Sequence, residues 1–552
     1  MVEHLLAQLL VAGALGQAEP RTEGALRFRE VSREWGLDFR HHHGGSGRRY
    51  MVETMVGGLA VFDYDGDGDL DVLFVDGGVL PGYQGEPPRT RLFRNDSRPG
   101  AIVFVDVTER AGIDFSGYGC GAAVGDVDGD GDLDLYLTAF GPNALYLNQG
   151  DGTFVEAGVA AGIADPTWSA SAVFFDAARD GDLDLYVANY VDFSLENHKF
   201  CGDTVRRIQG YCHPDSYQGE QDRFFRNRGD GTFEDATASA GFAGPREAGL
   251  GVVVADFDQD GWPDVYVAND LDPNLLFRNR GDGTFEDMSL LSGTSHSPAG
   301  RAEAGMGVEA ADLDGDGRLD LYVTNFALET NAFYRNQGDF LFLDQRFAAK
   351  LAEPSLTMLG FGVAAQDFDH DGDLDLFVAN GHILDNAEEL SDVKQYAQRN
   401  QVMENLGDGT FRERLDAGVD VVRVSRGLAT GDLDGDGDLD VVISNSNQEA
   451  EVYENLGAAP QRFLLVDLEA MRGNNRFGIG ARLTLRSRES SGEDRSQVRE
   501  VRTGSSYLSQ GAITVHFGLG GSTFSELEVR WPEGGLRRYR GLPAGVRVRA
   551  TQ

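Results

Sequence analysis

The chain has 552 residues, and because a single hydrophobic core stops growing at roughly 250–300 residues, it must comprise several domains or a closed repeat. Its formal net charge of -42 argues against nucleic acid and anionic membrane surfaces as partners. Glycine is abundant (73 residues), proline is not (16), and 41% of residues are hydrophobic, a mixture that favours many short strands joined by tight turns over disorder.

The first residues form an apolar segment. Residues 1–18 hold an apolar core from Leu5 to Leu15, a pattern typical of a secretory signal peptide. A buried N-terminal helix is the alternative, because Glu3 precedes the core and no Lys or Arg does. No other stretch approaches the ~18 apolar residues that a membrane span needs. We therefore expect a secreted or periplasmic protein without a membrane span.

The segment that follows is similar to the ends of later repeats. Residues 25–37 (LRFREVSREWGLD) share their aromatic, acidic and glycine residues with 152–163 (GTFVEAGVAAGI) and 231–242 (GTFEDATASAGF). The chain therefore begins with the last strand of a repeat whose other strands come later.

Each repeat contains four predicted strands. A small apolar strand such as 57–63 (GGLAVFD) comes first, an aspartate-rich loop follows, and a second strand such as 70–75 (LDVLFV) comes next. The third strand carries an aromatic residue and Asn, as in 92–95 (LFRN). A turn such as 150–154 (GDGTF) then leads into the fourth strand.

Seven copies of this unit predict a closed ring. The aspartate loops start between 50 and 80 residues apart. A four-stranded unit cannot bury both faces alone, so neighbours must stack. The seventh repeat has three strands at 424–455, and the Phe28 strand supplies its fourth, which removes an exposed sheet edge. We predict an all-β fold, a seven-bladed β-propeller over residues 25–460 closed by the N-terminal strand, with Gly- and Ala-rich first strands lining a central channel.

A different pattern follows the last repeat. Apolar and polar residues alternate through 461–552, as in 462–470 (RFLLVDLEA) and 480–486 (GARLTLR). Alternation of this kind predicts strands with one buried face. We expect residues 461–552 to form a separate small β domain.

Each aspartate loop spans nine residues, as in DYDGDGDLD (63–71). Carboxylates so close together repel one another, and a hard cation converts that repulsion into binding. Calcium takes roughly 6–8 oxygen ligands. We predict that loop positions 1, 3, 5 and 9 supply carboxylates and that position 7 supplies its backbone carbonyl. An EF-hand is excluded, because it needs Glu at position 12, where all seven repeats have an apolar residue such as Phe74 or Ile443.

We expect about six calcium sites. The third loop has Ala178 at position 3 and should bind calcium weakly or not at all. The predicted ligands, with Asp69 and Asp132 acting through their carbonyls, are Asp63, Asp65, Asp67, Asp69 and Asp71; Asp126, Asp128, Asp130, Asp132 and Asp134; Asp176, Asp180 and Asp184; Asp256, Asp258, Asp260 and Asp264; Asp312, Asp314, Asp316 and Asp320; Asp367, Asp369, Asp371 and Asp375; and Asp432, Asp434, Asp436 and Asp440.

The three cysteines have different expected roles. Cys201 and Cys212 lie eleven residues apart in one connection, and a disulfide between them would suit an exported protein. Cys120 falls in an apolar strand, where we expect a buried thiol.

Several motifs resemble known families. The aspartate loops with their leading Gly/Ala strands resemble the FG-GAP/VCBS repeats of integrin-type seven-bladed propellers. The segments RGNNRFGIGARLTLR (472–486), GSSYLSQ (504–510), VHFGLG (515–520) and VRWPEGG (529–535) are similar to the ASPIC/UnbV domain. The chain after residue 25 therefore resembles the cartilage acidic protein-like ASPIC/UnbV family. This resemblance implies the propeller fold, calcium binding and export, and it implies no settled biochemical activity.

Histidines and arginines gather on one predicted face. In a propeller the aspartate loops emerge on one face, and the connections that carry these residues emerge on the other. They are His41, His42, His43, His198, His213, His296 and His382, with Arg48, Arg49, Arg206 and Arg207. Such a group suits a metal ion or an anionic substrate, although long connections also collect polar residues without a site.

Two functional hypotheses follow. The favoured one is an exported, monomeric, calcium-binding module for binding or adhesion, which uses the face opposite the aspartate loops for an unidentified protein or carbohydrate ligand. The alternative is a propeller enzyme, a lyase or hydrolase acting on a carbohydrate or a biosynthetic intermediate at a His-rich site at the channel mouth. No nucleophile elbow, phosphate-binding loop or dinucleotide motif supports an enzyme, so we assign no catalytic residue.

Overall fold

Short antiparallel strands dominate the computed structural model, which describes residues 26–98, 100–203, 208–244, 246–390, 394–457, 462–471, 473, 475–488, 492 and 494–552. The all-β class predicted from the sequence is confirmed. The predicted signal segment 1–18, Arg206 and Arg207 lie outside the described residues. Among the described residues, no helix combines the length and hydropathy that a membrane crossing requires.

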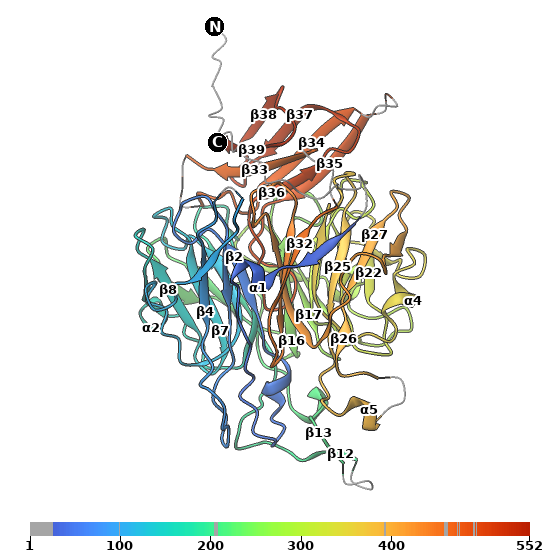
Figure 1. The fold of residues 1–552 in the computed structure, drawn as a ribbon. Coiled ribbons are helices and arrows are strands. Elements are labelled where there is room, and N and C mark those ends of the chain that lie inside the picture. The colour runs from blue at the N-terminus through green and yellow to red at the C-terminus, as the bar shows by residue number, and fades with distance from the viewer. Residues whose placement is uncertain are drawn as a thin grey trace.

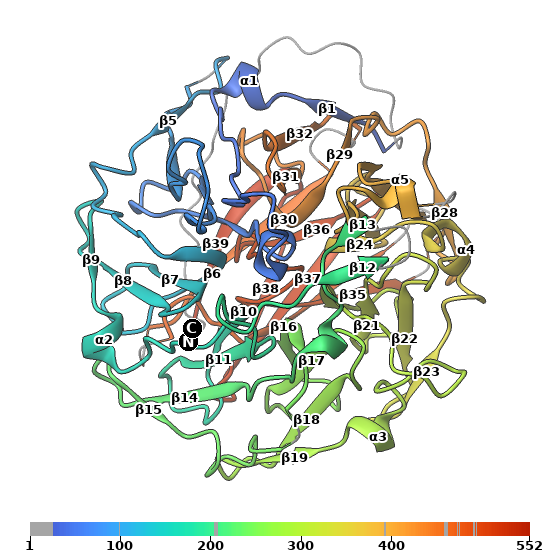
Figure 2. The same cartoon turned by 90° about the horizontal axis from the view of Figure 1, so that it is seen from below.

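Seven four-stranded sheets in the described repeat region surround a common centre (Figure 2). We number them in chain order, and each begins at the centre and ends at the rim. Their strands are β2 (Leu59–Phe62), β3 (Asp71–Phe74), β4 (Arg91–Asn95) and β5 (Phe104–Asp106); β6 (Tyr118–Gly125), β7 (Asp134–Phe140), β8 (Ala144–Asn148) and β9 (Phe154–Glu156); β10 (Ser169–Phe175), β11 (Asp184–Asn189), β14 (Arg223–Asn227) and β15 (Phe233–Asp235); β16 (Gly249–Ala255), β17 (Asp264–Asn269), β18 (Leu275–Asn279) and β19 (Phe285–Asp287); β20 (Val308–Ala311), β21 (Asp320–Val323), β22 (Ala332–Asn336) and β23 (Phe342–Asp344); β24 (Gly360–Gln366), β25 (Asp375–Asn380), β27 (Gln401–Asn405) and β28 (Phe411–Glu413); and β30 (Ser425–Gly431), β31 (Asp440–Asn445), β32 (Glu451–Asn455) and β1 (Phe28–Glu30).

The N-terminal strand is the rim strand of the seventh sheet. Phe28 of β1 pairs with Asn455 of β32, so the two ends of the repeat region meet in one sheet. The Phe28 ring also lies edge-on to Phe368 and Phe377, with ring centres 5.4 and 5.5 Å apart. This pairing covers an edge of β32 that would otherwise be open.

Apolar clusters join each pair of neighbouring sheets. Successive side chains of a strand point to opposite faces, so both faces of a sheet contribute to clusters with its two neighbours. The seventh and first sheets also share one, which includes Val442 and Val452 from the seventh and Leu59 and Phe74 from the first. Every sheet is therefore stabilised from both sides.

The remaining repeat-region elements are short. Helices α1 (Ser32–Trp35), α2 (Gly158–Ala161), α3 (Ser289–Ser292) and α4 (Ala352–Ser355) follow rim strands, and the connections carry η1 (Met51–Thr54), η2 (Pro214–Ser216), α5 (Ala387–Leu390), and the strand pairs β12 (Cys201–Asp203) with β13 (Ile208–Gly210) and β26 (Gln398–Arg399) with β29 (Val422–Arg423). Elements β12, β13 and α5 lie at the end of the ring far from the C-terminal sheets (Figure 1). We call that end the open face.

The C-terminal residues form two sheets over the other end of the ring (Figure 1). One contains β36 (Val515–Gly518), β33 (Phe463–Glu469) and β39 (Val546–Thr551), and the other contains β35 (Asp494–Glu500), β34 (Arg482–Arg488), β37 (Thr523–Arg530) and β38 (Leu536–Arg540). Their core is continuous with the ring, since Leu464 and Trp531 belong to the same hydrophobic cluster as Val127 and Phe174. This shared core was not predicted from the sequence.

The connection between β35 and β36 fills the centre of the ring, and we call residues 502–512 the central plug. The Gln510 carbonyl accepts the Val61 N–H at 3.0 Å. At the tip, the fully buried Tyr507 donates its hydroxyl to the Met55 carbonyl at 2.8 Å. A Cβ on Gly58 would lie 2.2 Å from the Leu508 carbonyl oxygen, so the first strand needs glycine where the plug passes. The channel expected from the sequence is therefore occupied by the chain itself.

Candidate functional site

The aspartate loops share one hydrogen-bond pattern. In the first loop, the carboxylate of Asp63 accepts the N–H groups of Gly66 at 2.8 Å and Gly68 at 2.9 Å. Asp71, which begins β3, accepts the N–H groups of Tyr64 at 2.9 Å and Asn95 at 2.8 Å. These bonds fold the nine residues back on themselves. The glycine at position 6 has a positive φ in every loop, +97° at Gly68, a conformation that other residues rarely adopt.

The folded loops bring carboxylates together. Oxygen atoms of three aspartates lie within 4.8 Å of one another in the first, second, fourth, fifth and sixth loops, as for Asp63, Asp65 and Asp71. Burial, followed by the neighbouring carboxylates, raises the pKa of Asp63 to about 6 and that of Asp71 to about 8. The loops therefore hold negative charge where water solvates it poorly.

This electrostatic cost predicts an unusual pH dependence for the calcium-free protein. Aspartate has a pKa of about 3.9 in unfolded chains. In the folded protein the pKa is about 6 for Asp63 and about 8 for Asp71. Between the unfolded and the folded pKa values, the folded state therefore binds more protons than the unfolded state. Stability then falls as pH rises through this window. Calcium-free protein should melt at a lower temperature at pH 8 than at pH 5. A higher melting temperature at pH 8 would contradict the raised pKa values.

Unsatisfied oxygens show that the loops suit a cation. In five loops a buried carboxylate oxygen has no hydrogen-bond partner among the described residues. These atoms include Oδ1 of Asp65, Asp256, Asp312, Asp367 and Asp432. Buried polar atoms are almost always satisfied in folded proteins. An all-oxygen donor set of this kind is the one that calcium takes, so the residues present fit calcium.

The third loop, which lacks the position-3 carboxylate, also differs from the others in its contacts. Both oxygens of Asp176 accept backbone N–H groups, from Asp180 and Gly181 at 3.0 Å. Arg179 stands at position 4, donates to the Pro532 carbonyl of the C-terminal sheets and lies 4.9 Å from the Trp262 ring centre. This loop therefore contacts the C-terminal sheets through an arginine.

Asparagines link the loops in a complete cycle that was not predicted from the sequence. Each third strand ends in an Asn whose Nδ2 donates to the position-2 carbonyl of the preceding sheet's loop. The pairs are Asn95 to Leu433, Asn148 to Tyr64, Asn227 to Val127, Asn279 to Ala177, Asn336 to Phe257, Asn405 to Leu313 and Asn455 to Phe368. The recurring Asn in the third-strand motif was the available signal, and its role depends on a neighbour 79 or more residues away.

Replacing one of these asparagines should destabilise the ring. Asn336 is fully buried and donates to Phe257 at 2.9 Å and to Leu319 at 3.0 Å. Asn336→Ala leaves two buried carbonyls unsatisfied, and we expect it to lower the free energy of unfolding by about 2 kcal/mol. Chemical denaturation measures the loss. The neighbouring, exposed Gln337 provides the control, and equal effects of Asn336→Ala and Gln337→Ala would contradict the linking role.

The C-terminal sheets cover the aspartate loops. Arg547 donates to the Gly68 carbonyl of the first loop at 2.8 Å. Glu500 accepts the Asp256 N–H of the fourth loop at 3.3 Å, and Arg482 donates to the Gly317 carbonyl of the fifth. Arg495 contacts Asp373 of the sixth. The C-terminal sheets therefore contact the loop face at several points, whereas the open face carries no such domain.

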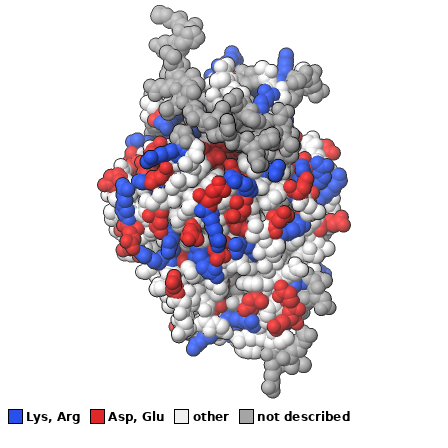
Figure 3. Space-filling model, viewed as in Figure 1, with Lys and Arg blue, Asp and Glu red and all other residues white. Residues whose placement is uncertain are grey.

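The wall of the ring carries mixed charge. Lys and Arg side chains lie among Asp and Glu in the view of Figure 3. Exposed pairs include Arg29 with Glu454 at 2.7 Å and Arg91 with Asp106 at 3.1 Å. Much of the net negative charge lies instead in the covered aspartate loops.

The predicted histidines of the open face have separate local partners. His42 Nδ1 lies 3.0 Å from the carboxylate of Asp76. The exposed His213 lies 3.2 Å from Asp215. The others have different neighbours: His41 accepts the Asn447 N–H, His43 the Gly45 N–H and His382 the Leu384 N–H, while His198 packs on Tyr50 and His296 lies beside Ser295. Among the described residues, Nε2 of His41, Nε2 of His382 and Nδ1 of His198 are buried without a hydrogen-bond partner.

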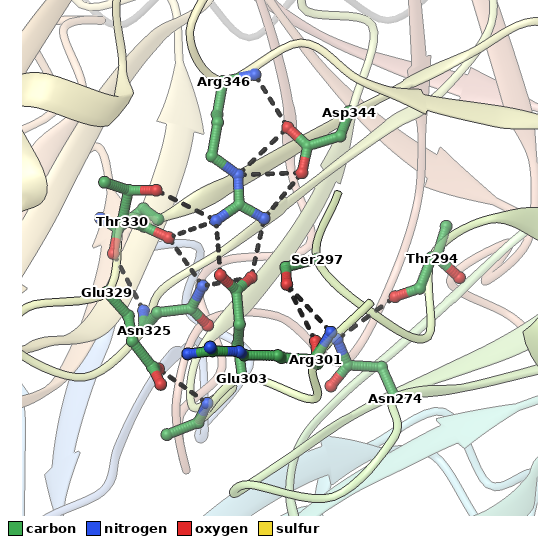
Figure 4. Close-up of polar contacts among 12 residues, drawn as sticks. Asn274, Thr294, Ser297, Arg301, Glu303, Asn325, Glu329, Thr330, Asp344 and Arg346 are labelled. Atoms are coloured by element: carbon green, nitrogen blue, oxygen red, sulfur yellow. Dashed lines mark hydrogen bonds and ion pairs between the residues drawn. The ribbon is translucent and has the colours of Figure 1, made fainter. Parts of the chain in front are cut away.

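A buried ion-pair network fixes connections on one side of the ring (Figure 4). The guanidinium of Arg346 binds Glu303 at 2.7 Å and Asp344 at 2.7 Å and donates to the Thr330 carbonyl at 2.8 Å. Burial alone would lower the pKa of Arg346, but the hydrogen bonds and negative charges of Glu303 and Asp344 raise it. Separating these groups would leave a buried charge without its partner, which is strongly unfavourable. The ion pairs therefore hold these connections in place.

A cleft lies among the connections of the third and fourth sheets on the open face. Its volume is about 310 Å³, and its walls include Tyr217, Gln218, Asp215, Arg246 and Asp270. Asp270 is buried and accepts the Tyr190 hydroxyl at 2.5 Å, and burial raises its pKa to about 7. Polar groups and an aromatic ring thus line a concave surface open to solvent.

The cysteines behave as expected. Cys201 and Cys212 form a disulfide that joins β12 to the segment after β13, and Cys120 is a buried free thiol. Cross-linking a loop of this length restricts the unfolded chain, so Cys201→Ser with Cys212→Ser should cost about 2 kcal/mol of stability. Denaturation of the double variant and of reduced wild type should agree. No loss in either would show that the crosslink leaves the unfolded chain unrestricted.

Two protein families match the chain. The FG-GAP-like repeat matches residues 63–137, 126–187, 215–267, 256–323, 312–378 and 392–443, and the ASPIC and UnbV family matches residues 471–552. Cartilage acidic protein 1 of Xenopus tropicalis is 27% identical over 86% of this chain and 70% of its own length. The Homo sapiens protein of the same name is 28% identical over 86% of this chain and 69% of its own length.

Solved structures resemble the fold more distantly. One is a lectin of Agrocybe aegerita that specifically recognises non-reducing terminal N-acetylglucosamine. It aligns with a TM-score of 0.36 and 17% identity over 65% of this chain and 79% of its own. A Bacillus licheniformis rhamnogalacturonan lyase aligns with a TM-score of 0.30 and 12% identity over 80% of this chain and 91% of its own. Similarities at this level carry no inference about a ligand. The two family matches, which between them span most of the chain, show that it belongs to the cartilage acidic protein-like family of FG-GAP-repeat proteins with a C-terminal ASPIC/UnbV domain.

Proposed function

We propose that this protein is an exported, calcium-binding β-propeller that acts as a binding or adhesion module for a protein or carbohydrate ligand through its open face. One observation carries the proposal: the C-terminal sheets cover the aspartate loops and the central plug fills the channel, which leaves the open face available.

Seven blades closed by the N-terminal strand are part of this proposal. The apolar cluster between the seventh and first sheets and the pairing of Phe28 with Asn455 support it. So does the asparagine cycle, in which the first sheet's Asn95 donates to Leu433 of the seventh. A closed ring has no open sheet edge toward its neighbours and suits a rigid binding scaffold.

Calcium would be held by six of the seven loops. Carboxylates at positions 1, 3, 5 and 9 and the carbonyl at position 7 would coordinate it, as with Asp63, Asp65, Asp67 and Asp71 and the Asp69 carbonyl. The ion would supply positive charge to buried carboxylates and stabilise the loop face on which the C-terminal sheets rest. The third loop would remain without calcium, because Ala178 replaces the carboxylate at its position 3.

Export is supported by the disulfide between Cys201 and Cys212. Disulfides persist in oxidising compartments and are rare in the cytosol. The crosslink lies on the open face beside β12 and β13, where a ligand-binding surface would need rigid connections.

Ligand capture by variants of the open face tests the proposal. Calcium-loaded full-length protein would be screened against glycan arrays and a panel of extracellular proteins. Asp215→Lys and Arg246→Glu change exposed residues of the 310 Å³ cleft, and Glu234→Lys changes the rim strand β15 as a matched control. We expect at least tenfold weaker capture by the cleft variants and unchanged capture by the control. Equal binding by all three, or chemical turnover of a captured ligand, would refute it.

A further inference from the structure

Two histidines from distant parts of the chain meet in the interface between the ring and the C-terminal sheets. His370 stands at position 4 of the sixth aspartate loop, and His516 lies in β36. Their Nε2 atoms are 3.1 Å apart, and both side chains are buried. Asp438, at position 7 of the seventh loop, places its Oδ1 3.5 Å from His370 Nε2 and is also buried. Two imidazoles and one carboxylate from three separate segments thus share one location.

The relative orientation of the rings distinguishes two arrangements. The Nε2 atom of an imidazole lies about 1.1 Å from the centre of its ring. If both Nε2 atoms point at one ion about 2.05 Å away, the ring centres are about 1.5 times as far apart as the two nitrogens, which gives about 4.8 Å. A head-to-head N–H···N hydrogen bond of the same length would separate the centres by about 5.3 Å. The ring centres of His370 and His516 are 4.8 Å apart. This separation matches two imidazoles whose Nε2 atoms converge on one ion.

The surroundings agree with this arrangement. Phe463 packs against both rings, with centres 5.7 Å from His370 and 6.5 Å from His516, and shields them from bulk solvent. His516 also lines a cavity of about 100 Å³, and a cavity of that size has room for a water that would complete the coordination. An apolar side chain beside the ligands limits the access of solvent to a metal site.

We propose that His370, His516 and Asp438 bind one transition-metal ion of the zinc type, which fastens the C-terminal sheets to the sixth and seventh aspartate loops. Imidazole with carboxylate selects zinc and its neighbours, whereas calcium takes oxygen ligands. The site is therefore chemically distinct from the aspartate loops that flank it. The ion would link His516 of the C-terminal sheets to His370 and Asp438 of the ring. The central plug is a second connection between the same two parts.

Metal analysis of the full-length protein tests the site. Protein would be loaded with zinc in calcium buffer, freed of excess metal by gel filtration and measured by inductively coupled plasma mass spectrometry. We expect about one zinc per wild-type chain and at least a tenfold lower zinc content in His516→Asn, with calcium content unchanged. The exposed His213→Asn is the matched control and should keep its zinc. Wild type without zinc, or His516→Asn with as much zinc as wild type, would overturn the proposal.

A second measurement uses wild type alone, in case His516→Asn fails to fold. Crystals of zinc-loaded protein would be measured at the zinc absorption edge. We expect an anomalous peak within bonding distance of the Nε2 atoms of His370 and His516. A map with no peak there, or with zinc peaks only in the aspartate loops, would overturn the site and leave the calcium-binding and ligand-binding proposals untouched.

Discussion

Removing calcium lowers the melting temperature of the full-length protein by at least about 15 °C, the largest effect we expect. An ion that binds only the folded state stabilises it by about 2.7 kcal/mol at a hundred times its dissociation constant, so six independent sites contribute about 16 kcal/mol. Scanning calorimetry with calcium and with excess chelator measures the difference. An unchanged melting curve would defeat the assignment of calcium to the aspartate loops.

A pair of substitutions in one loop checks that the effect arises there. Asp63→Asn removes a position-1 carboxylate, whereas Asp69→Asn changes an exposed position-7 side chain whose carbonyl is the expected ligand. We expect Asp63→Asn to bind one calcium fewer per chain and Asp69→Asn to bind as many as wild type. Calorimetric titration gives the stoichiometry, and equal loss in both variants would contradict the assignment of positions.

Truncating the tip of the central plug has the second-largest expected effect. Tyr507 is fully buried, stacks edge-on with Phe361 at 4.8 Å and donates to the Met55 carbonyl. Tyr507→Ala leaves a cavity at the centre of the ring, and removing a buried aromatic side chain costs about 3–5 kcal/mol. Chemical denaturation of the calcium-loaded full chain measures this loss.

The matching conservative variant separates packing from hydrogen bonding. Tyr507→Phe keeps the ring and loses only the hydroxyl, so we expect a cost of about 1 kcal/mol. Because the plug belongs to the C-terminal part of the chain, Tyr507→Ala should also make the peptide bonds of residues 502–512 more sensitive to protease. A cost below about 1 kcal/mol for Tyr507→Ala would show that the plug does not hold the two parts together.

The elements that the sequence predicted are those encoded within a few residues. The aspartate loop needs only nine residues to specify its turn, because Asp63 bonds to Gly66 and Gly68 within its own loop. Strand order within a sheet follows from short connections in the same way. The N-terminal strand was found because residues 25–37 repeat the rim-strand pattern of later repeats.

The elements that the sequence missed depend on residues far apart in the chain. The Asn of the third strand was visible as a motif, yet its partner lies in the neighbouring sheet's loop, as for Asn95 and Leu433. The predicted grouping of histidines on the open face followed only from connection order. In the structure His42 lies beside Asp76, whereas Nε2 of His41 and of His382 is buried without a hydrogen-bond partner among the described residues.

The sequence by itself determined the all-β repeat, the seven aspartate loops and the C-terminal β domain, because period and local turn chemistry are written in consecutive residues. Only the tertiary structure decided that the C-terminal sheets cover those loops, that residues 502–512 fill the channel and that His370 meets His516. These contacts join surfaces whose complementarity exists only after each part has folded. An alternating strand pattern specifies which side of a strand is buried and leaves open what buries it.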